Sequence, residues 1–227
     1  AFVMKNIIKK LLTSIILLFV GNIKTEKSIF LLCKSRIATT NTLKLIKAYV
    51  SRLNIHIEGH DNKASISGLW RRGELVIIGN NNNLTIEEGC YLTNTRITIR
   101  GNNCSIAIGK DVTSGSLYMA CMGQGNYITI GDDCMLSENV NIWSTDSHGI
   151  YDMKDNLLNP SKPVKIGSHV WLGKGSSVLK GATIGDGAIV GMDTIVNKDI
   201  IANTLVVGTP MRTVKENILW KRGFIDK

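Results

Sequence analysis

The chain has 227 residues, of which 44% are hydrophobic and 20% are charged. This composition is typical of a globular protein and excludes an intrinsically disordered chain. Residues 1–56 carry ten Lys or Arg and one acidic residue, whereas the rest of the chain carries equal numbers of both kinds. The whole net charge of +9 therefore lies in the N-terminal segment.

Residues 1–56 are predicted to form helices. Residues 5–23 and 42–53 contain no proline, and their apolar residues lie broadly three and four positions apart. The unbroken apolar stretch 15–20 is too short to span a bilayer, and no small-x-small cleavage site follows it. Two roles stay open for these helices: peripheral contact with an anionic membrane surface, or packing against the coil end or between subunits. Nucleic-acid binding is disfavoured, because no stacking aromatic residues accompany the lysines.

A glycine and, seven residues later, an isoleucine recur four times in the next part of the chain. The glycines are 20, 22 and 22 residues apart. This spacing matches one coil with three six-residue sides plus a few loop residues. Gly and Asn suit the corners of such a coil because both tolerate positive φ. The pairs are Gly59 and Ile66, Gly79 and Ile86, Gly101 and Ile108, and Gly123 and Ile130.

Residues 166–201 follow a period of six. The first position of each frame is aliphatic, the fifth is mostly small, and the second is glycine in four of six frames. So many glycines exclude a helix, and the period predicts short strands separated by bends, as in a parallel β-helix covering about residues 57–201. The first positions are Ile166, Leu172, Val178, Ile184, Val190 and Val196, and the fifth positions are Val170, Ser176, Ala182, Ala188, Thr194 and Ile200.

The period breaks at a loop excursion, residues 148–165, which contains two of the three prolines. Loops of this length in compact domains are usually functional or disordered. His148 begins the loop, with Asp146 two residues before it, which fits a general base whose ring is oriented by an acid. Asp146 could equally cap the amides of the loop, and both roles stay open. His56 and His60 are interpreted as structural or solvated, and His169 as a surface residue or one that supports the site from behind its contact residues.

Metal and disulfide sites are not indicated. The five cysteines form no CxxC pair, which favours buried free thiols. A metal would need three ligands, and only His148 and His169 are plausible together. No metal is therefore predicted.

The stretches DSHGIYD, KIGSHVWLGKGSSVLKGATIGDGAIVGMDTIVNKDI and VVGTPMRTVKE resemble the bacterial hexapeptide-repeat acyltransferases. The upstream GNN repeats and the ending KENILWKRGF are similar to the O-acetyltransferases of bacterial surface polysaccharides, the sialic acid and capsule group. The resemblance implies an all-β fold: a left-handed parallel β-helix at residues 57–212. We expect helical segments on both sides of it, at 1–56 and, as a short C-terminal helix, at 213–227.

The resemblance also implies an activity. His148 would take the proton of a sugar hydroxyl as that oxygen attacks the thioester of acetyl-CoA, with Trp171 near the reacting carbonyl or supporting the donor. The acceptor would be a bacterial surface polysaccharide or its precursor, in the cytoplasm or at the inner membrane. Two alternatives stay open: N-acetylation of a nucleotide-linked amino sugar, and a non-catalytic β-helix scaffold.

The same resemblance implies a homotrimer with sites between subunits, in which the loop excursion reaches the neighbouring subunit. Outward polar residues near this cleft could meet the sugar: Glu138, Asn139, Asn141 and Tyr151. Met192 stands where the family usually has Ala or Gly, which departs from the pattern. Residues matching the acetyl-CoA positions are Gly173, Lys174, Met192, Asn197, Lys198, Arg212 and Lys215.

Overall fold

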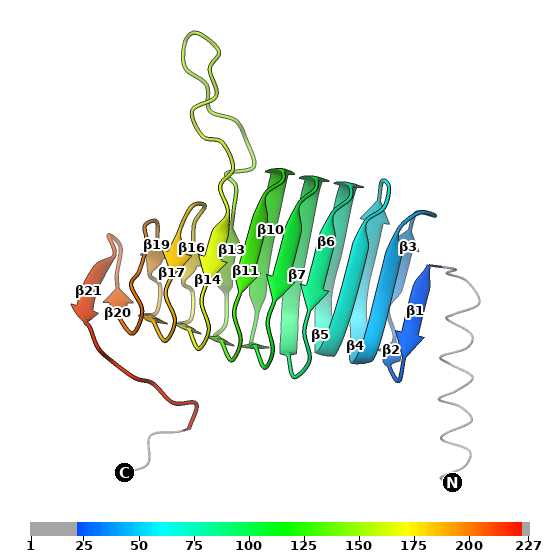
Figure 1. The fold of residues 1–227 in the computed structure, drawn as a ribbon, viewed down its shortest axis with the longest axis horizontal. Helices are drawn as coiled ribbons and strands as arrows, with labels where there is room; N and C mark the ends of the chain where they lie inside the picture. Colours follow the sequence, from blue (N-terminus) through cyan, green and yellow to red (C-terminus); the bar gives the residue numbers. More distant parts are fainter. Residues whose placement is uncertain (1–21, 224–227) are drawn as a thin grey trace.

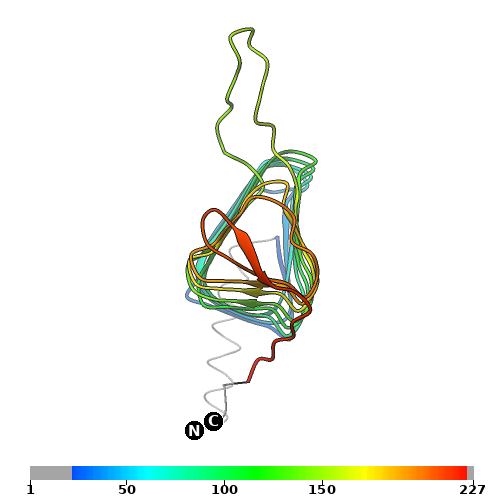
Figure 2. The same cartoon turned by 90° about the vertical axis from the view of Figure 1, so that its left-hand side faces the viewer.

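The computed structural model describes residues 22–223, which form a parallel β-helix (Figure 1). Viewed along its axis, the coil is three-sided, and one long loop projects from a corner (Figure 2). Each strand pairs in parallel with the strand one coil away, except for the antiparallel pair β20 and β21 at the end. The predicted parallel β-helix is therefore confirmed.

The longest strands, β4 and β5, follow three short strands at the N-terminal end, and the strands of the later coils are short again. The early strands are β1 (Ile23–Glu26), β2 (Ile29–Leu31), β3 (Lys34–Ile37), β4 (Thr42–Glu58), β5 (Lys63–Asn80), β6 (Asn83–Ile86), β7 (Tyr91–Asn102), β8 (Ser105–Ile108), β9 (Thr113–Ser114), β10 (Leu117–Gln124) and β11 (Tyr127–Ile130). The later strands are β12 (Met135–Leu136), β13 (Val140–Trp143), β14 (Val164–Ile166), β15 (Trp171–Leu172), β16 (Ser177–Val178), β17 (Thr183–Ile184), β18 (Ile189–Val190), β19 (Ile195–Val196), β20 (Leu205–Val207) and β21 (Arg212–Lys215).

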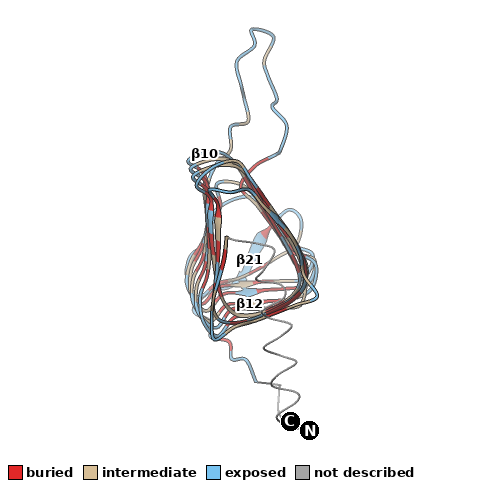
Figure 3. Ribbon diagram, turned by 90° about the vertical axis from the view of Figure 1, so that its right-hand side faces the viewer, coloured by how far each residue is buried: buried red, intermediate tan, exposed pale blue. Residues whose placement is uncertain are grey.

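The core is a stack of aliphatic side chains inside the coil. Buried residues recur along the sides of the coil (Figure 3). All six predicted first-position residues, from Ile166 to Val196, are at most 3% exposed, and the six fifth-position residues are also buried. The isoleucines of the upstream repeats are buried as well. The period of six therefore identified the residues that face the interior.

The upstream corners are built from glycine and asparagine. Gly79 has φ +118°, and a Cβ there would overlap the carbonyl oxygen of Gly101 on the next coil. Inside the corner, the Asn62 side chain donates to Asn41 Oδ1 at 2.9 Å and to the Gly79 carbonyl at 2.7 Å. These contacts explain the GNN pattern: glycine permits the close approach of two coils, and asparagine satisfies the polar groups of the backbone.

The prediction of a helix at residues 42–53 is wrong, because this segment lies within β4. Its buried apolar residues are two and three positions apart, since alternation is interrupted by bends at Lys47 and Arg52, both with positive φ. A mixture of these spacings resembles helical periodicity. The coil therefore begins at Ile23 rather than near residue 57, and the predicted helix at 5–23 otherwise lies outside the described residues. The buried apolar residues of β4 are Leu43, Leu45, Ala48, Val50, Leu53, Ile55 and Ile57.

The predicted C-terminal helix is also wrong for the described residues 213–223. Residues up to Lys215 belong to β21, and the following residues run back along the coil without regular structure. Asn217 has φ +57°, and the Ile218 amide donates to the Asn203 carbonyl rather than within a helical turn. Across residues 22–223, no helix is long and apolar enough to cross a membrane.

Candidate functional site

The loop excursion leaves the coil between β13 and β14 and carries His148 at its root (Figure 1). Met135 pairs with Trp171, whereas Trp171 pairs with Ile189, so the coil that carries the loop spans twice as many residues as the next one. The Lys162 amide donates to the Ser144 carbonyl at 3.0 Å and closes the base of the loop. We call residues 146–161 the loop arm.

Asp146 fastens the loop arm to the next coil. Its Oδ2 accepts a hydrogen bond from Lys180 Nζ at 2.6 Å and one from Asn159 Nδ2 at 2.8 Å. These two bonds, that of Lys180 above all, lower the pKa of Asp146 below its ordinary value. Lys180 also donates to the Asn159 carbonyl, so the outgoing and returning limbs of the arm are joined at one point.

The His148 backbone is fixed by the same contacts, while its side chain is exposed. Its amide donates to the Asp146 carbonyl at 2.8 Å, and its carbonyl accepts from Asn159 Nδ2 at 2.9 Å. Among the described residues, no hydrogen bond joins the Asp146 carboxylate to the His148 ring. The Asp146 carboxylate accepts from the Lys180 and Asn159 side chains, and no described backbone amide of the loop donates to it. Neither of the two roles left open for Asp146 is therefore seen, and the general-base role of His148 stays a prediction.

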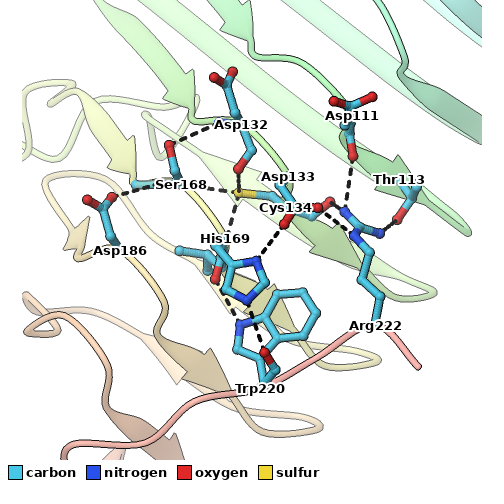
Figure 4. Close-up of polar contacts among 12 residues, drawn as sticks. Asp111, Thr113, Asp132, Asp133, Cys134, Ser168, His169, Asp186, Trp220 and Arg222 are labelled. Carbon is cyan, nitrogen blue, oxygen red and sulfur yellow. Dashed lines mark hydrogen bonds and ion pairs between the residues drawn. The ribbon is translucent and has the colours of Figure 1, made fainter. Parts of the chain in front are cut away.

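A second cluster holds the C-terminal residues on the coil (Figure 4). His169 Nδ1 donates to Asp133 Oδ2 at 2.6 Å, and Nε2 donates to the Trp220 carbonyl at 3.0 Å. Burial alone would raise the pKa of Asp133, but hydrogen bonds from Arg222 and His169 outweigh it and lower that pKa. His169 therefore links the coil at Asp133 to the C-terminal residues.

Trp171 lies at the edge of this cluster. It begins the two-residue strand β15, its side chain points outward with 36% of its surface exposed, and its ring centroid is 5.9 Å from that of Trp220. Its ladder neighbours are Met135 on β12 and Ile189 on β18. An exposed indole on a short strand can meet a ligand, and its predicted role stays a prediction.

The residues predicted to contact acetyl-CoA lie on the later coils. The Gly173 amide donates to the Val190 carbonyl at 2.8 Å, so this amide is committed to the ladder and cannot face a ligand. Lys174 Nζ forms an ion pair with Glu138 at 3.0 Å. The Met192 side chain is 63% exposed to solvent. The remaining members of the set are exposed: Asn197, Lys198, Arg212 and Lys215.

The residues predicted to meet the acceptor sugar are divided between two places. Glu138, Asn139 and Asn141 lie together on the coil, where the Asn139 amide donates to Ser116 Oγ at 2.6 Å. Tyr151 lies out on the loop arm and forms an isolated antiparallel bridge with Leu157. The ion pair between Glu138 and Lys174 places the predicted sugar and donor residues side by side.

Four of the five cysteines are buried, and a hydrogen bond with Cys121 lowers the pKa of Cys104 to about 7. All five cysteines are free, and burial raises the pKa of Cys90 and of Cys134 to about 11, so both stay protonated. Within residues 22–223, no group of three or more His, Cys, Asp or Glu side chains is arranged to hold a metal ion.

Sequence reasoning missed the partners that hold the site. Lys180 and Asn159 gave no signal, because each is an isolated polar residue whose contact depends on the path of the loop. Trp220 and Arg222 lie in a segment that was assigned to a helix, where they would count as ordinary surface residues. The sequence offered one signal for these contacts: Trp220 and Arg222 are an aromatic and a basic residue two positions apart in a short polar tail.

The comparisons with known proteins agree with the β-helical fold. Residues 163–198 match the model described as bacterial transferase hexapeptide (six repeats). A polysialic acid O-acetyltransferase of Neisseria meningitidis is 42% identical over 189 residues, which cover 73% of this chain and 88% of that protein. The chain belongs to the hexapeptide-repeat acetyltransferase family that includes this enzyme. It is therefore an acyltransferase.

Further relatives support the same assignment. A polysialic acid O-acetyltransferase of Escherichia coli O1:K1 / APEC is 37% identical over 118 residues, covering 52% of this chain and 38% of that protein. The crystal structure of the polysialic acid O-acetyltransferase OatWY has a TM-score of 0.61 and 28% identity, covering 89% of this chain and 92% of that one. The polySia-specific acetyltransferase NeuO has a TM-score of 0.67 over 90% and 91% of the two chains, and at 23% identity it supports the fold alone.

Proposed function

We propose that this acyltransferase moves an acetyl group from acetyl-CoA to a hydroxyl of an anionic surface polysaccharide of the polysialic acid type. The observation that carries the proposal is the 42% identity to a polysialic acid O-acetyltransferase over most of both chains. The coils are proposed to wind in the left-handed sense that the family resemblance implies.

In the proposed reaction, the acceptor hydroxyl attacks the thioester carbonyl directly. His148 takes the hydroxyl proton through a ring nitrogen, the oxygen–carbon bond forms, and the carbon–sulfur bond of the thioester breaks. The proton then passes to the departing thiolate of coenzyme A. The fixed backbone of His148 and its exposed ring suit this role, because a general base must be held in place and still reach the substrate.

The later coils have the charge that a donor with several phosphates requires. Lys198, Arg212 and Lys215 are exposed, and within the described chain no ion pair occupies them. Basic side chains of this kind form charge-assisted hydrogen bonds to phosphate. We assign the nucleotide end of acetyl-CoA to these three residues. The Gly173 amide is left out of this assignment because it is bonded within the ladder.

The first coils carry the charge that an anionic acceptor requires. Residues 22–72 contain ten Lys or Arg and three acids. Parallel pairing places Lys24 beside Lys44 on the neighbouring strand. A long polyanion can contact many such charges at once, which predicts binding that weakens as salt screens the charges.

We also propose that the protein acts as a homotrimer in which the loop arm contacts the neighbouring subunit. The arm extends well beyond the coil (Figure 2). Its large apolar side chains are exposed in the single chain, and exposed apolar clusters mark contact surfaces. They are Ile150, Tyr151, Met153, Leu157 and Leu158.

The proposal of a cytoplasmic protein in peripheral contact with the inner membrane now rests on residues 1–21. Residues from Ile23 onward belong to the coil, so the amphipathic-helix argument no longer applies to them. Flotation with anionic liposomes tests the proposal on the full chain and on a chain without residues 1–21. Flotation of the full chain alone is expected, and equal behaviour of both chains would contradict it.

The activity is tested by thiol release from acetyl-CoA. We expect release that depends on added polysialic acid and that is inhibited by high salt. A nucleotide-linked amino sugar and a neutral polysaccharide are the competing acceptors. Release with the amino sugar alone would replace O-acetylation with N-acetylation, and release with none of the acceptors would contradict the proposal.

A further inference from the structure

The last described residues form a strap along the outside of the coil. This C-terminal strap, residues 216–223, runs back from β21 over the corners of successive coils (Figure 1). The Ile218 amide donates a hydrogen bond to the Asn203 carbonyl, Trp220 contacts His169, and Arg222 contacts Asp133. The strap therefore passes beside Trp171, which lies two residues after His169.

We propose that Trp220 is a positioning residue for Trp171, so that the C-terminal strap forms one wall of the acyl-transfer site. The inference rests on the proposed function, in which Trp171 lies beside the reacting thioester. In this inference Trp220 acts by orienting Trp171 and does not itself contact the substrate.

Trp220 is held in one orientation by opposing contacts with a single residue. Its Nε1 donates to the His169 carbonyl at 2.8 Å, while its own carbonyl accepts from His169 Nε2 at 3.0 Å. The two rings also stack, with centroids 4.1 Å apart and planes 9° apart (Figure 4). Rotation of the indole would break the Nε1 bond and the stacking together, so its edge is fixed.

Trp171 is more exposed than the strap residue that it contacts. It is 36% exposed, whereas Trp220 is 7% exposed. Its strand has two residues, and the planes of the two indoles meet at 48° with centroids 5.9 Å apart. A tilted aromatic contact of this kind is favourable. The strap thus supplies a fixed surface on one side of a partly exposed indole.

Arg222 anchors the strap beyond Trp220. Its guanidinium donates to Asp133 Oδ1 at 2.6 Å and to Thr113 Oγ1 at 2.9 Å. It also donates to the carbonyls of Asp111 and Cys134 at 3.0 and 2.9 Å. These contacts span two coils, and Asp133 joins them to His169. The anchor therefore fixes the ring of His169 on which Trp220 lies.

Kinetics of strap variants test this role. Trp220→Ala is expected to lower kcat by about 10- to 100-fold, since displacing a reacting group by about 1 Å can cost this much. The KM values for acetyl-CoA and acceptor are expected to change little, because Trp220 contacts neither. Trp220→Phe keeps the stacking ring and is expected to recover most of the rate. Leu219→Ala, at a strap residue that is 84% exposed, is the matched control and is expected to match wild type.

A spectroscopic readout separates this inference from the activity itself. The chain has four tryptophans, so labelling with 5-fluorotryptophan gives four fluorine resonances that Trp→Phe variants assign. Arg222→Ala keeps Trp220 in the chain and removes its anchor. We expect the Trp171 resonance to broaden or double in Arg222→Ala and to stay unchanged in Leu219→Ala.

The outcomes are distinct. Absence of acetyl transfer in the wild type would end the proposed function, while the resonance of Trp171 would still report whether the strap fixes it. Wild-type kcat in a folded Trp220→Ala variant would overturn the inference. If that variant does not fold, an unchanged Trp171 resonance in Arg222→Ala would overturn it instead.

Discussion

The loop arm and the C-terminal strap are two additions to the same coil, and they are held in opposite ways. The arm is fastened only at its root, where Asp146 meets Lys180 and Asn159, and its tip is exposed. The strap is fastened along its length, from Ile218 to Arg222. Both anchors pair a carboxylate with a distant cation: Asp146 with Lys180 of the next coil, and Asp133 with Arg222 of the strap. The difference indicates that the arm fixes the backbone of His148 and leaves its own tip free, whereas the strap fixes the ring of Trp220.

The largest expected effect comes from the arm. His148→Ala should lower kcat by about two to four orders of magnitude, the usual contribution of a positioned acid-base group. The folded state should be unaffected, because the His148 ring is exposed. Thiol release and circular dichroism on the same preparation measure both quantities. A folded variant at the wild-type rate would place the base elsewhere.

A smaller effect is expected from the root of the arm. Lys180→Met removes the donor that bridges Asp146 and the Asn159 carbonyl, which frees the two limbs of the arm. We expect kcat to fall by about tenfold, because His148 loses its fixed position without being removed. Lys154→Met at the exposed tip is the matched control and should keep the wild-type rate. Equal rates for the two variants would contradict the role of the root.

The smallest expected effect is on stability in acid. Both anchor carboxylates, Asp133 and Asp146, have pKa values lowered in the folded protein. Their contribution to stability is therefore complete above the ordinary carboxyl pKa of about 4, and it is lost as the pH falls through the lower folded values. The Tm difference between wild type and a variant with Asp133→Asn and Asp146→Asn should stay constant near neutral pH and shrink below about pH 4. A difference that grows in acid would contradict this assignment.

The period of the sequence predicted the coil because each inward position needs an aliphatic side chain. Ile166, Leu172 and their successors face the interior for this reason. The same reasoning failed at β4, where bends at Lys47 and Arg52 break the alternation and imitate a helix. No glycine marks these two bends in the sequence, because Lys47 and Arg52 adopt the positive φ angles.

The candidate site was only partly predictable. His148 and Trp171 were found from their place in motifs, but their supports come from residues far away in the chain. Lys180 reaches Asp146 from the next coil, and Arg222 reaches Asp133 from the C-terminal end. Such contacts depend on how the coils stack and on the path of an irregular tail. No local pattern encodes that path.

The central claim is that this coil transfers acetyl groups to hydroxyls of an anionic polysaccharide. The most direct measurement incubates the full chain with radiolabelled acetyl-CoA and polysialic acid, isolates the polysaccharide and treats it with neutral hydroxylamine, which cleaves esters and spares amides. We predict label on the polysaccharide that hydroxylamine releases. Unlabelled polysaccharide, or label that resists hydroxylamine, would contradict the account.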